Sequence, residues 1–255
     1  MIARRAFTLV ELLVVLAIIV VLLGLLLPRL RAARMQALST QDMALQRSLM
    51  QAHVAYMNVH GERFVDVGLP HGTPADPSLS FVHRLSPYFG GSSAAFKSPL
   101  DYSPHWSPED GGDGVPVADS GQPIWRHTSY GMNNYLSRTF SPAVALDGPE
   151  AAVDRLNVVR DPSQVVCFLL MTEVGAYASA DHPHVEEWGA APDPARQAAT
   201  QCLIDAIGRS RPGSDSRSNY AFLDGRVESR QFGDVFRSAE SNKFDPELQR
   251  QQPAP

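Results

Sequence analysis

The feature that most constrains this chain is an apolar run close to its N-terminus. Residues 7–27 read FTLVELLVVLAIIVVLLGLLL, and Glu11 is the only charged residue among them. A helix rises about 1.5 Å per residue, so a run of about 21 residues crosses the hydrocarbon core of a bilayer, which is about 30 Å thick. The run therefore predicts a transmembrane helix.

Residues 1–6, MIARRA, form a short basic leader that we expect to stay in the cytoplasm, although the arginines at positions 29, 31 and 34 weaken this charge asymmetry. A secretory signal has a shorter apolar region followed by a small-residue cleavage site, whereas Pro28 and an arginine follow this run. A carboxylate at the centre of a spanning helix costs about 2.5–3.5 kcal/mol, and such a group usually has a partner. A generic signal anchor, the alternative, leaves Glu11 unexplained.

Residues 6–11, AFTLVE, resemble the processing signal of type IV prepilins and type II secretion pseudopilins. The resemblance implies that a prepilin peptidase cuts between Ala6 and Phe7 and methylates the new amino terminus of Phe7. It also implies that the Glu11 carboxylate pairs with the amino terminus of a neighbouring subunit and so sets the register of a filament. The family most often has Gly before the cut, where this chain has the equally small Ala6. Pro28 matches a family proline that allows the helix to kink.

Helical character continues over residues 28–60, and Gly61 marks the end of the helix. An apolar stripe on this segment predicts an amphipathic helix whose apolar face is covered by a sheet or by loops. The stripe consists of Leu38, Leu45, Leu49, Ala52 and Tyr56. The expected fold is therefore α+β and pilin-like, with a long N-terminal α-helix, transmembrane in its first half, packed on an antiparallel β-sheet head with long loops. We expect residues 61–243 to form a periplasmic globular head and residues 244–255 to form a disordered tail.

Segments rich in β-branched and aromatic residues predict five strands, at residues 124–130, 156–159, 165–172, 219–223 and 226–232. Asp224 and Gly225 join the last two and predict a two-residue type I′ turn, which places Phe222 opposite Val227. Short helices are expected at residues 79–85 and 195–207, and Pro- and Gly-rich loops between residues 69 and 123.

Two stretches of the head, SYGMN at 129–133 and SNYAFLDGRV at 218–227, resemble segments of a large pilin-like group. The C-terminal motif of that group is a His, nine residues, then Asp-Gly. Asp224 and Gly225 supply the Asp-Gly pair, but Ser214 stands at the position of the His. The role of that His therefore does not carry over to this chain.

An acidic stretch places several hard oxygen ligands in one flexible segment, with Asp110, Asp113 and Asp119 as candidate ligands for Ca²⁺. The resemblance adds support, because major pseudopilins of type II secretion hold a calcium ion in a head loop. The spacing does not match an EF-hand, and a solvated acidic turn is the favoured alternative. No other cofactor is expected.

His182 and His184, with Glu186 and Glu187 close by, could contact a transition metal. A proline between the two histidines and the lack of a third ligand at helical spacing favour a polar surface loop instead.

Cys167 and Cys202 are the two cysteines of the chain, too few for a disulfide scaffold and without metal-site spacing. The apolar run around Cys167 favours a buried free thiol. In an exported domain, a bridge between Cys167 and Cys202 is the alternative.

The sequence contains no GxSxG elbow, HExxH helix, P-loop or GxGxxG turn, so we expect no enzyme. The net charge of −5, without a basic stripe, argues against a nucleic-acid binder.

The expected protein is a pseudopilin or minor pilin of a type II secretion or type IV pilus-like filament. Its expected partners are prepilin peptidase, other pilin subunits and an inner-membrane assembly platform. It would cross the inner membrane once, with its N-terminus in the cytoplasm and its head in the periplasm, before joining a filament in the periplasm or at the cell surface. The alternative is a membrane-anchored binding module whose head captures an adhesin target, a secreted substrate or DNA.

Overall fold

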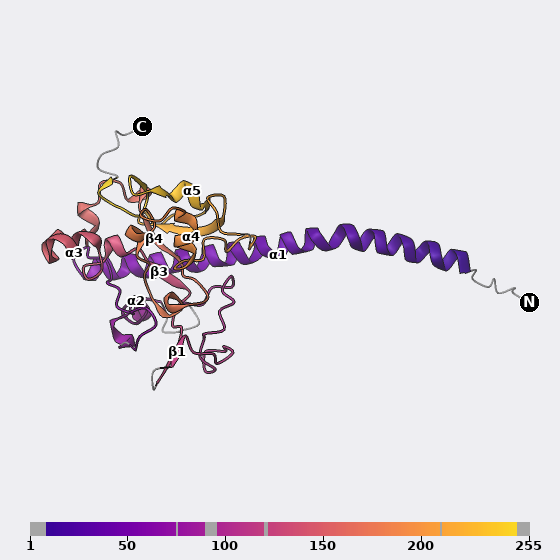
Figure 1. The fold of residues 1–255 in the computed structure, drawn as a ribbon, viewed down its shortest axis with the longest axis horizontal. Helices are drawn as coiled ribbons and strands as arrows, with labels where there is room; N and C mark the ends of the chain where they lie inside the picture. Colours follow the sequence, from indigo (N-terminus) through magenta and orange to yellow (C-terminus); the bar gives the residue numbers. More distant parts are fainter. Residues whose placement is uncertain (1–8, 75, 90–95, 120–121, 210, 249–255) are drawn as a thin grey trace, which may run out of the picture. The chain divides into compact units, whose positions relative to one another are not determined.

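The computed structural model describes the chain apart from residues 1–8, 75, 90–95, 120–121, 210 and 249–255 (Figure 1). The chain divides into an N-terminal unit, Met1–Leu38, and a C-terminal unit, Ser39–Pro255. One helix, α1 (Leu9–Val59), belongs to both units and continues through Pro28.

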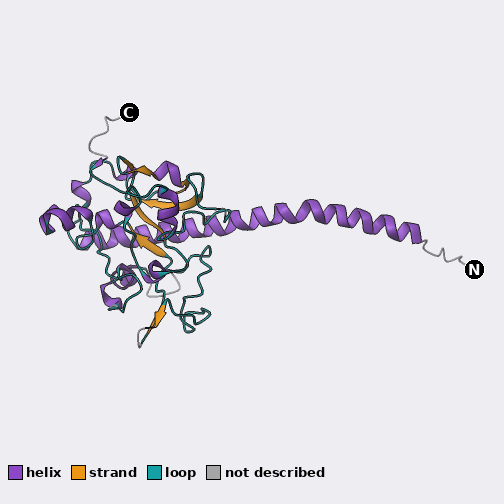
Figure 2. Ribbon diagram, in the orientation of Figure 1, coloured by secondary structure: helices purple, strands orange, loops and turns teal. Residues whose placement is uncertain are grey.

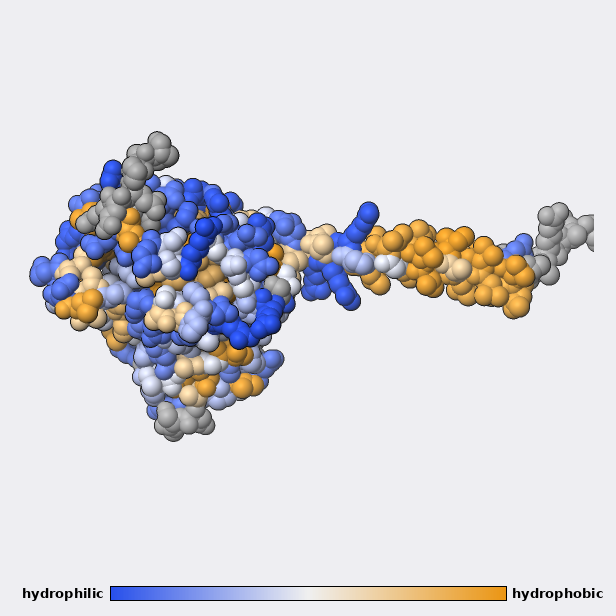
Figure 3. All heavy atoms as spheres, turned by 45° about the horizontal axis from the view of Figure 1, so that its top comes forward, coloured by the Kyte–Doolittle hydropathy of each residue, from blue (hydrophilic) through white to orange (hydrophobic). Residues whose placement is uncertain are grey.

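The N-terminal unit consists of the first part of α1. The apolar side chains of this part are exposed all round, from 77 % for Leu9 to 45 % for Val15, and they cover its surface before the arginines (Figure 3). By length and composition the helix is apolar enough to span a membrane. A helix that is hydrophobic on every side requires lipid or other helices around it, as predicted for residues 7–27.

The second part of α1 packs into the C-terminal unit. Its buried face is polar toward the N-terminal side and mostly apolar toward the C-terminal end of the helix. Its buried residues are Ser39, Asp42, Gln46, Leu49, Met50, Ala52, His53 and Met57. The predicted extent of the helix is confirmed, and Gly61, with a φ of +65°, follows its end. The predicted stripe is only partly right, because Leu38, Leu45 and Tyr56 are half-buried. Hydrogen-bonded polar residues take the buried positions instead.

An antiparallel sheet in the order β3-β4-β5-β6 lies against α1 in this unit (Figure 1). Its strands are β3 (Tyr130–Met132), β4 (Val166–Leu170), β5 (Arg217–Phe222) and β6 (Val227–Gln231). Asp42 of α1 contacts Tyr130, and the ring of His53 lies 5.4 Å from that of Phe168. Aromatic residues, including Trp188 and Phe222, form a core cluster with Val166 and Leu169 of β4. Strand β4 is therefore buried on both faces, which explains its unbroken apolar sequence.

Short elements and long loops complete the C-terminal unit (Figure 2). The remaining strands pair as β1 (Ala118–Asp119) with β2 (Pro123–Ile124), and β7 (Phe236–Ser238) with β8 (Ser241–Asn242). The remaining α-helices are α2 (Phe81–Leu85), α3 (Pro142–Asp147), α4 (Pro194–Ala199) and α5 (Phe232–Val235). The 3-10 helices are η1 (Pro77–Leu79), η2 (Ser86–Tyr88), η4 (Asn134–Leu136), η5 (Pro149–Ala151), η6 (Leu156–Val158), η7 (Pro162–Gln164), η8 (Ala176–Ser179) and η9 (Val185–Glu187). The predicted α+β architecture is confirmed.

Several local predictions are wrong. The segment 156–159 contains a 3-10 helix rather than a strand, and 124–130 is divided between the ends of β2 and β3. Helix α4 ends at Ala199, well short of the predicted residue 207, because the chain beyond it pairs with the end of β4. There the N–H of Leu203 donates to the carbonyl of Leu170 at 2.9 Å. Tertiary pairing has overridden helix propensity at this point.

The hairpin between β5 and β6 turns through a three-residue loop rather than the predicted two-residue turn. Gly225 adopts a φ of +88°, and its N–H donates to the carbonyl of Phe222 at 2.9 Å. A type I turn followed by a left-handed residue is the usual form of such a loop. The extra residue shifts the register by one, so Val227 pairs with Ala221. The predicted pairing of Phe222 with Val227 is therefore wrong.

The core of the C-terminal unit includes a residue beyond position 243. Phe244, which was predicted to begin a disordered tail, is fully buried against Trp188, with 5.2 Å between the ring centroids. Asn133 Nδ2 donates to the Phe244 carbonyl at 2.6 Å. The predicted start of the tail is therefore wrong. Phe244 packs in the core although its neighbours in the sequence are polar.

Candidate functional site

The residues predicted to direct processing and assembly lie in or before α1. Ala6 and Phe7 fall outside the described residues. Glu11 lies in the first turn of α1 and is exposed on the N-terminal unit. Negative charge near a helix N-terminus is stabilised by the helix dipole. Glu11 is thus placed at one end of an apolar cylinder, with Pro28 at the other end of the apolar run.

The acidic stretch forms a turn on the surface of the C-terminal unit. Ser107 Oγ donates to Asp110 Oδ2 at 2.8 Å, and Asp113 is exposed. The side chain of Asp119 is not among those described. Asp110 and Asp113 do not belong to the cluster of potential metal ligands found in the described part of the chain. A calcium site here stays a prediction.

The two cysteines do not form the bridge that the sequence left open. Both Cys167 and Cys202 are free and buried. Cys167 Sγ lies 3.5 Å from His53 Nδ1, and burial raises the pKa of both thiols well above the usual value. These thiols act as small hydrophobic groups, as the apolar run around Cys167 suggested.

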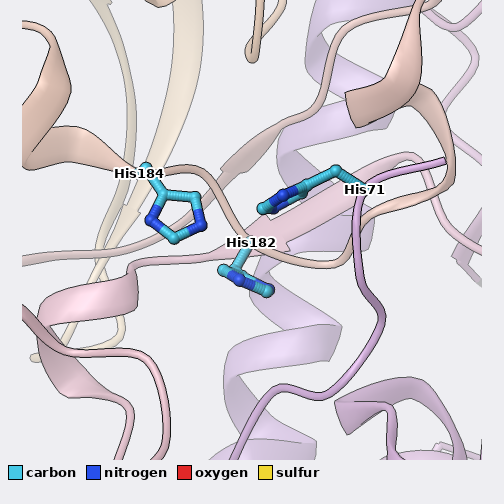
Figure 4. A group of neighbouring side chains, drawn as sticks. All are labelled: His71, His182 and His184. Atoms are coloured by element: carbon cyan, nitrogen blue, oxygen red, sulfur yellow. The ribbon is translucent and has the colours of Figure 1, made fainter. Parts of the chain in front are cut away.

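A cluster of three histidines lies elsewhere in the same unit (Figure 4). Its members are His71, His182 and His184, and one ligand atom from each lies within 4.8 Å of the other two. His182 is fully buried, so the predicted polar surface loop is wrong for this residue. The sequence pattern missed His71, because this third member comes from the loop that follows α1 rather than from a helical spacing.

Asp181 holds the position of His182. The backbone N–H groups of Gly68, Leu69 and Phe81 donate to the Asp181 carboxylate at 3.0–3.4 Å. Its Oδ1 also lies 3.0 Å from His182 Nδ1. The carboxylate therefore joins the loop that carries His71 to the loop that carries His182.

Glu186 orients His184 in a similar way. Glu186 Oε1 lies 3.0 Å from His184 Nδ1, and Asn134 Nδ2 donates to Glu186 Oε2 at 2.6 Å. The hydrogen bond with Glu186 raises the pKa of His184, whereas burial, helped by the two neighbouring histidines, lowers the pKa of His71 to about 4. Glu187 has a different role, because its Oε2 accepts a hydrogen bond from Gln201.

Comparison with known proteins identifies the N-terminal segment. Residues 1–27 match the family model described as the prokaryotic N-terminal methylation motif. No curated protein and no solved structure matches the chain. The matched segment contains Ala6, Phe7 and Glu11. It ends before Ser214 and the Asp-Gly pair, so the match does not include the C-terminal motif. The chain therefore carries a prokaryotic N-terminal methylation motif, and among the described residues the one helix apolar enough to span a membrane begins within it.

Proposed function

We propose that the chain is a structural subunit, a pseudopilin or minor pilin, of a type II secretion or type IV pilus-like filament. The observation that carries this proposal is the methylation motif on residues 1–27, joined to an apolar helix that is exposed all round. A single-pass anchor in the inner membrane fits both features. In the proposed topology the N-terminus faces the cytoplasm and the C-terminal unit faces the periplasm.

Processing by prepilin peptidase between Ala6 and Phe7 would create a new amino terminus a few residues before Glu11. A carboxylate in a spanning helix costs about 2.5–3.5 kcal/mol at the bilayer centre and somewhat less near the interface, and Glu11 lies in the first turn of α1. Pairing with the amino terminus of a neighbouring subunit would offset that cost only in the correct stagger. Glu11 would thus act as a register device, which is the best-attested role of buried polar groups.

Assembly would replace lipid around α1 with the helices of other subunits. Lipid tails are as apolar as the leucines of the helix, so helix association in a membrane depends on packing and on polar contacts rather than on the hydrophobic effect. Glu11 is the charged residue that the apolar run offers for such a contact. An inner-membrane assembly platform would be the partner that moves subunits into the filament.

The decisive experiment is to determine the N-terminus of the membrane-inserted protein by mass spectrometry. We expect N-methylated Phe7 as the first residue in cells that contain prepilin peptidase, and an intact leader in cells that lack it. An intact Met1 on the mature protein in the presence of the peptidase would contradict the proposal.

A further inference from the structure

Within the described part of the C-terminal unit, two buried histidine nitrogens lack a hydrogen-bond partner. Nε2 of His71 and Nε2 of His182 are inaccessible to solvent, and no partner for them lies among the residues that the structure describes. His182 is fully buried. A buried polar atom without a partner is costly, and an ion or a water molecule that completes the site is one explanation for it.

The carboxylates beside the cluster select the tautomers that a metal requires. Asp181 and Glu186 each lie 3.0 Å from the Nδ1 atom of a histidine, His182 and His184 respectively. When Nδ1 carries the proton and donates it to a carboxylate, the lone pair is on Nε2. Metal-binding histidines almost always donate their other ring N–H in this manner, because the partner fixes the tautomer and the ring orientation.

The supports of the cluster are themselves held in place. Asp181 accepts hydrogen bonds from three backbone N–H groups, and Glu186 accepts one from Asn134. The ring of His71 is stacked on Tyr177 at 4.1 Å, and the ring of His182 lies 4.3 Å from that of Phe140. Three imidazoles are therefore presented together by a scaffold that limits their motion.

We propose that His71, His182 and His184 bind one divalent transition metal ion, with Zn²⁺ as the preferred occupant. Imidazole is a borderline ligand suited to Zn²⁺, and three histidines leave the fourth tetrahedral position for a solvent-derived ligand. Bonds of about 2.0–2.1 Å would place the nitrogens roughly 3.3 Å apart. The ligand atoms already lie within 4.8 Å of one another, so small rotations of the rings complete the site.

The three histidines differ in their exposure. The side chain of His184 is 22 % exposed, whereas that of His182 is fully buried. His71 is half-buried, so His182 would be the innermost ligand of the proposed site. Once bound, the ion would join the loop that follows α1 to the loop that precedes η9, and so would cross-link two distant parts of the chain.

The test uses the full-length protein in detergent, stripped of metal with a chelator and titrated with Zn²⁺ alone by calorimetry. We expect one ion per chain, and at least a hundredfold weaker binding in His71→Gln and in His184→Gln. Glu186→Gln keeps all three ligands and removes only the charge beside His184, so binding should weaken by about 10–100-fold. His83→Gln, which alters an exposed histidine of α2 outside the cluster, should bind as the parent protein does.

Substitution with Co²⁺ identifies the ligands independently. We expect the absorption of a tetrahedral nitrogen and oxygen site without the intense bands of thiolate ligation. Thiolate bands, the absence of stoichiometric binding, or equal affinities in the parent protein and the two histidine variants would overturn the proposal. If His71→Gln unfolds the unit, as judged by tryptophan fluorescence, the more exposed His184 and Glu186 variants decide the result.

Discussion

Asn219 of β5 donates a hydrogen bond of 2.8 Å from Nδ2 to Oδ2 of Asp42 on α1, and both residues are fully buried. Asp42 also accepts hydrogen bonds from Ser98, Tyr130 and Gln46. Burial raises the pKa of Asp42, although these hydrogen bonds oppose the shift. One carboxylate thus attaches the second part of α1 to two strands of the sheet and to a loop.

Asp42→Ala should lower the free energy of unfolding of the C-terminal unit by about 3 kcal/mol or more, because several buried donors lose their acceptor at about 1–3 kcal/mol each. All three tryptophans lie in this unit, so urea unfolding followed by tryptophan fluorescence measures the change. Gln51→Ala, on the exposed side of α1, is the control and should change the value by less than about 0.5 kcal/mol. If Asp42→Ala lowered the free energy of unfolding no more than Gln51→Ala does, the hydrogen bonds of Asp42 would not stabilise the unit.

Loss of the buried ion pair between Arg126 and Asp101 should also lower the free energy of unfolding of the C-terminal unit. Their side chains are 0 % and 1 % exposed, with 2.7 Å between Nε and Oδ2. The guanidinium also donates to the carbonyls of Met171, Thr172 and Ala178. Arg126→Met should cost about 3–5 kcal/mol, because it leaves a buried carboxylate without its partner. The double variant Arg126→Met with Asp101→Leu should recover part of this loss in the same urea measurement; a further loss would contradict the explanation.

His53 makes the stability of the C-terminal unit depend on pH. Burial lowers the pKa of His53 to about 3, and its Nε2 accepts the N–H of Val65 at 3.2 Å. The unfolded chain therefore binds a proton below about pH 6.5 that the folded chain does not bind. Stability should fall as the pH drops below about 6.5, by about 2 kcal/mol at pH 5 from this group alone.

His53→Gln should remove that part of the pH dependence while lowering stability at neutral pH. The measurement is the difference in unfolding free energy between parent and variant, followed from about pH 7.5 to about pH 5. Because His71 also has a lowered pKa, the difference between the two proteins isolates His53. Parallel pH profiles would exclude the proposed role of His53.

The buried thiols should resist alkylation. Cys167 is 0 % and Cys202 2 % exposed, and only the thiolate reacts with iodoacetamide. Burial raises the pKa of both thiols, so we expect almost no labelling of the folded protein and labelling of both thiols in urea without a reductant. Labelling in urea only after reduction would instead reveal a disulfide.

Glu11→Ala should leave membrane insertion intact and abolish filament assembly. Each contact between subunits would leave a neighbour's amino terminus without its partner, at about 3 kcal/mol or more, which is more than a hundredfold in the assembly constant. Sheared filaments and cross-linked multimers, detected with antibody, report the result. Val14→Ala, a change to an apolar residue of the same helix, serves as the control. Unchanged filaments in Glu11→Ala would favour a membrane-anchored binding module over a filament subunit.

Several features of this protein follow from local sequence. Hydropathy and length in residues 7–27 are properties of a contiguous segment, and they suffice to predict a helix that is apolar enough to span a membrane. The methylation motif, which the comparison confirms, was implied by the resemblance of residues 6–11 to a prepilin processing signal. The long helix and the strands β4, β5 and β6 were also predictable, because apolar runs and turn residues act over a few positions.

Tertiary structure alone decided the rest. The polar face of α1 depends on Asn219, which is 177 residues from Asp42 along the chain, and no periodicity can reveal such a partner. The hairpin register depends on one left-handed residue at Gly225. The histidine cluster required the loop after α1 to be attached to Asp181, 113 residues away from Gly68. Local patterns report what a segment can bury, whereas hydrogen bonding between distant segments determines which polar groups are buried together.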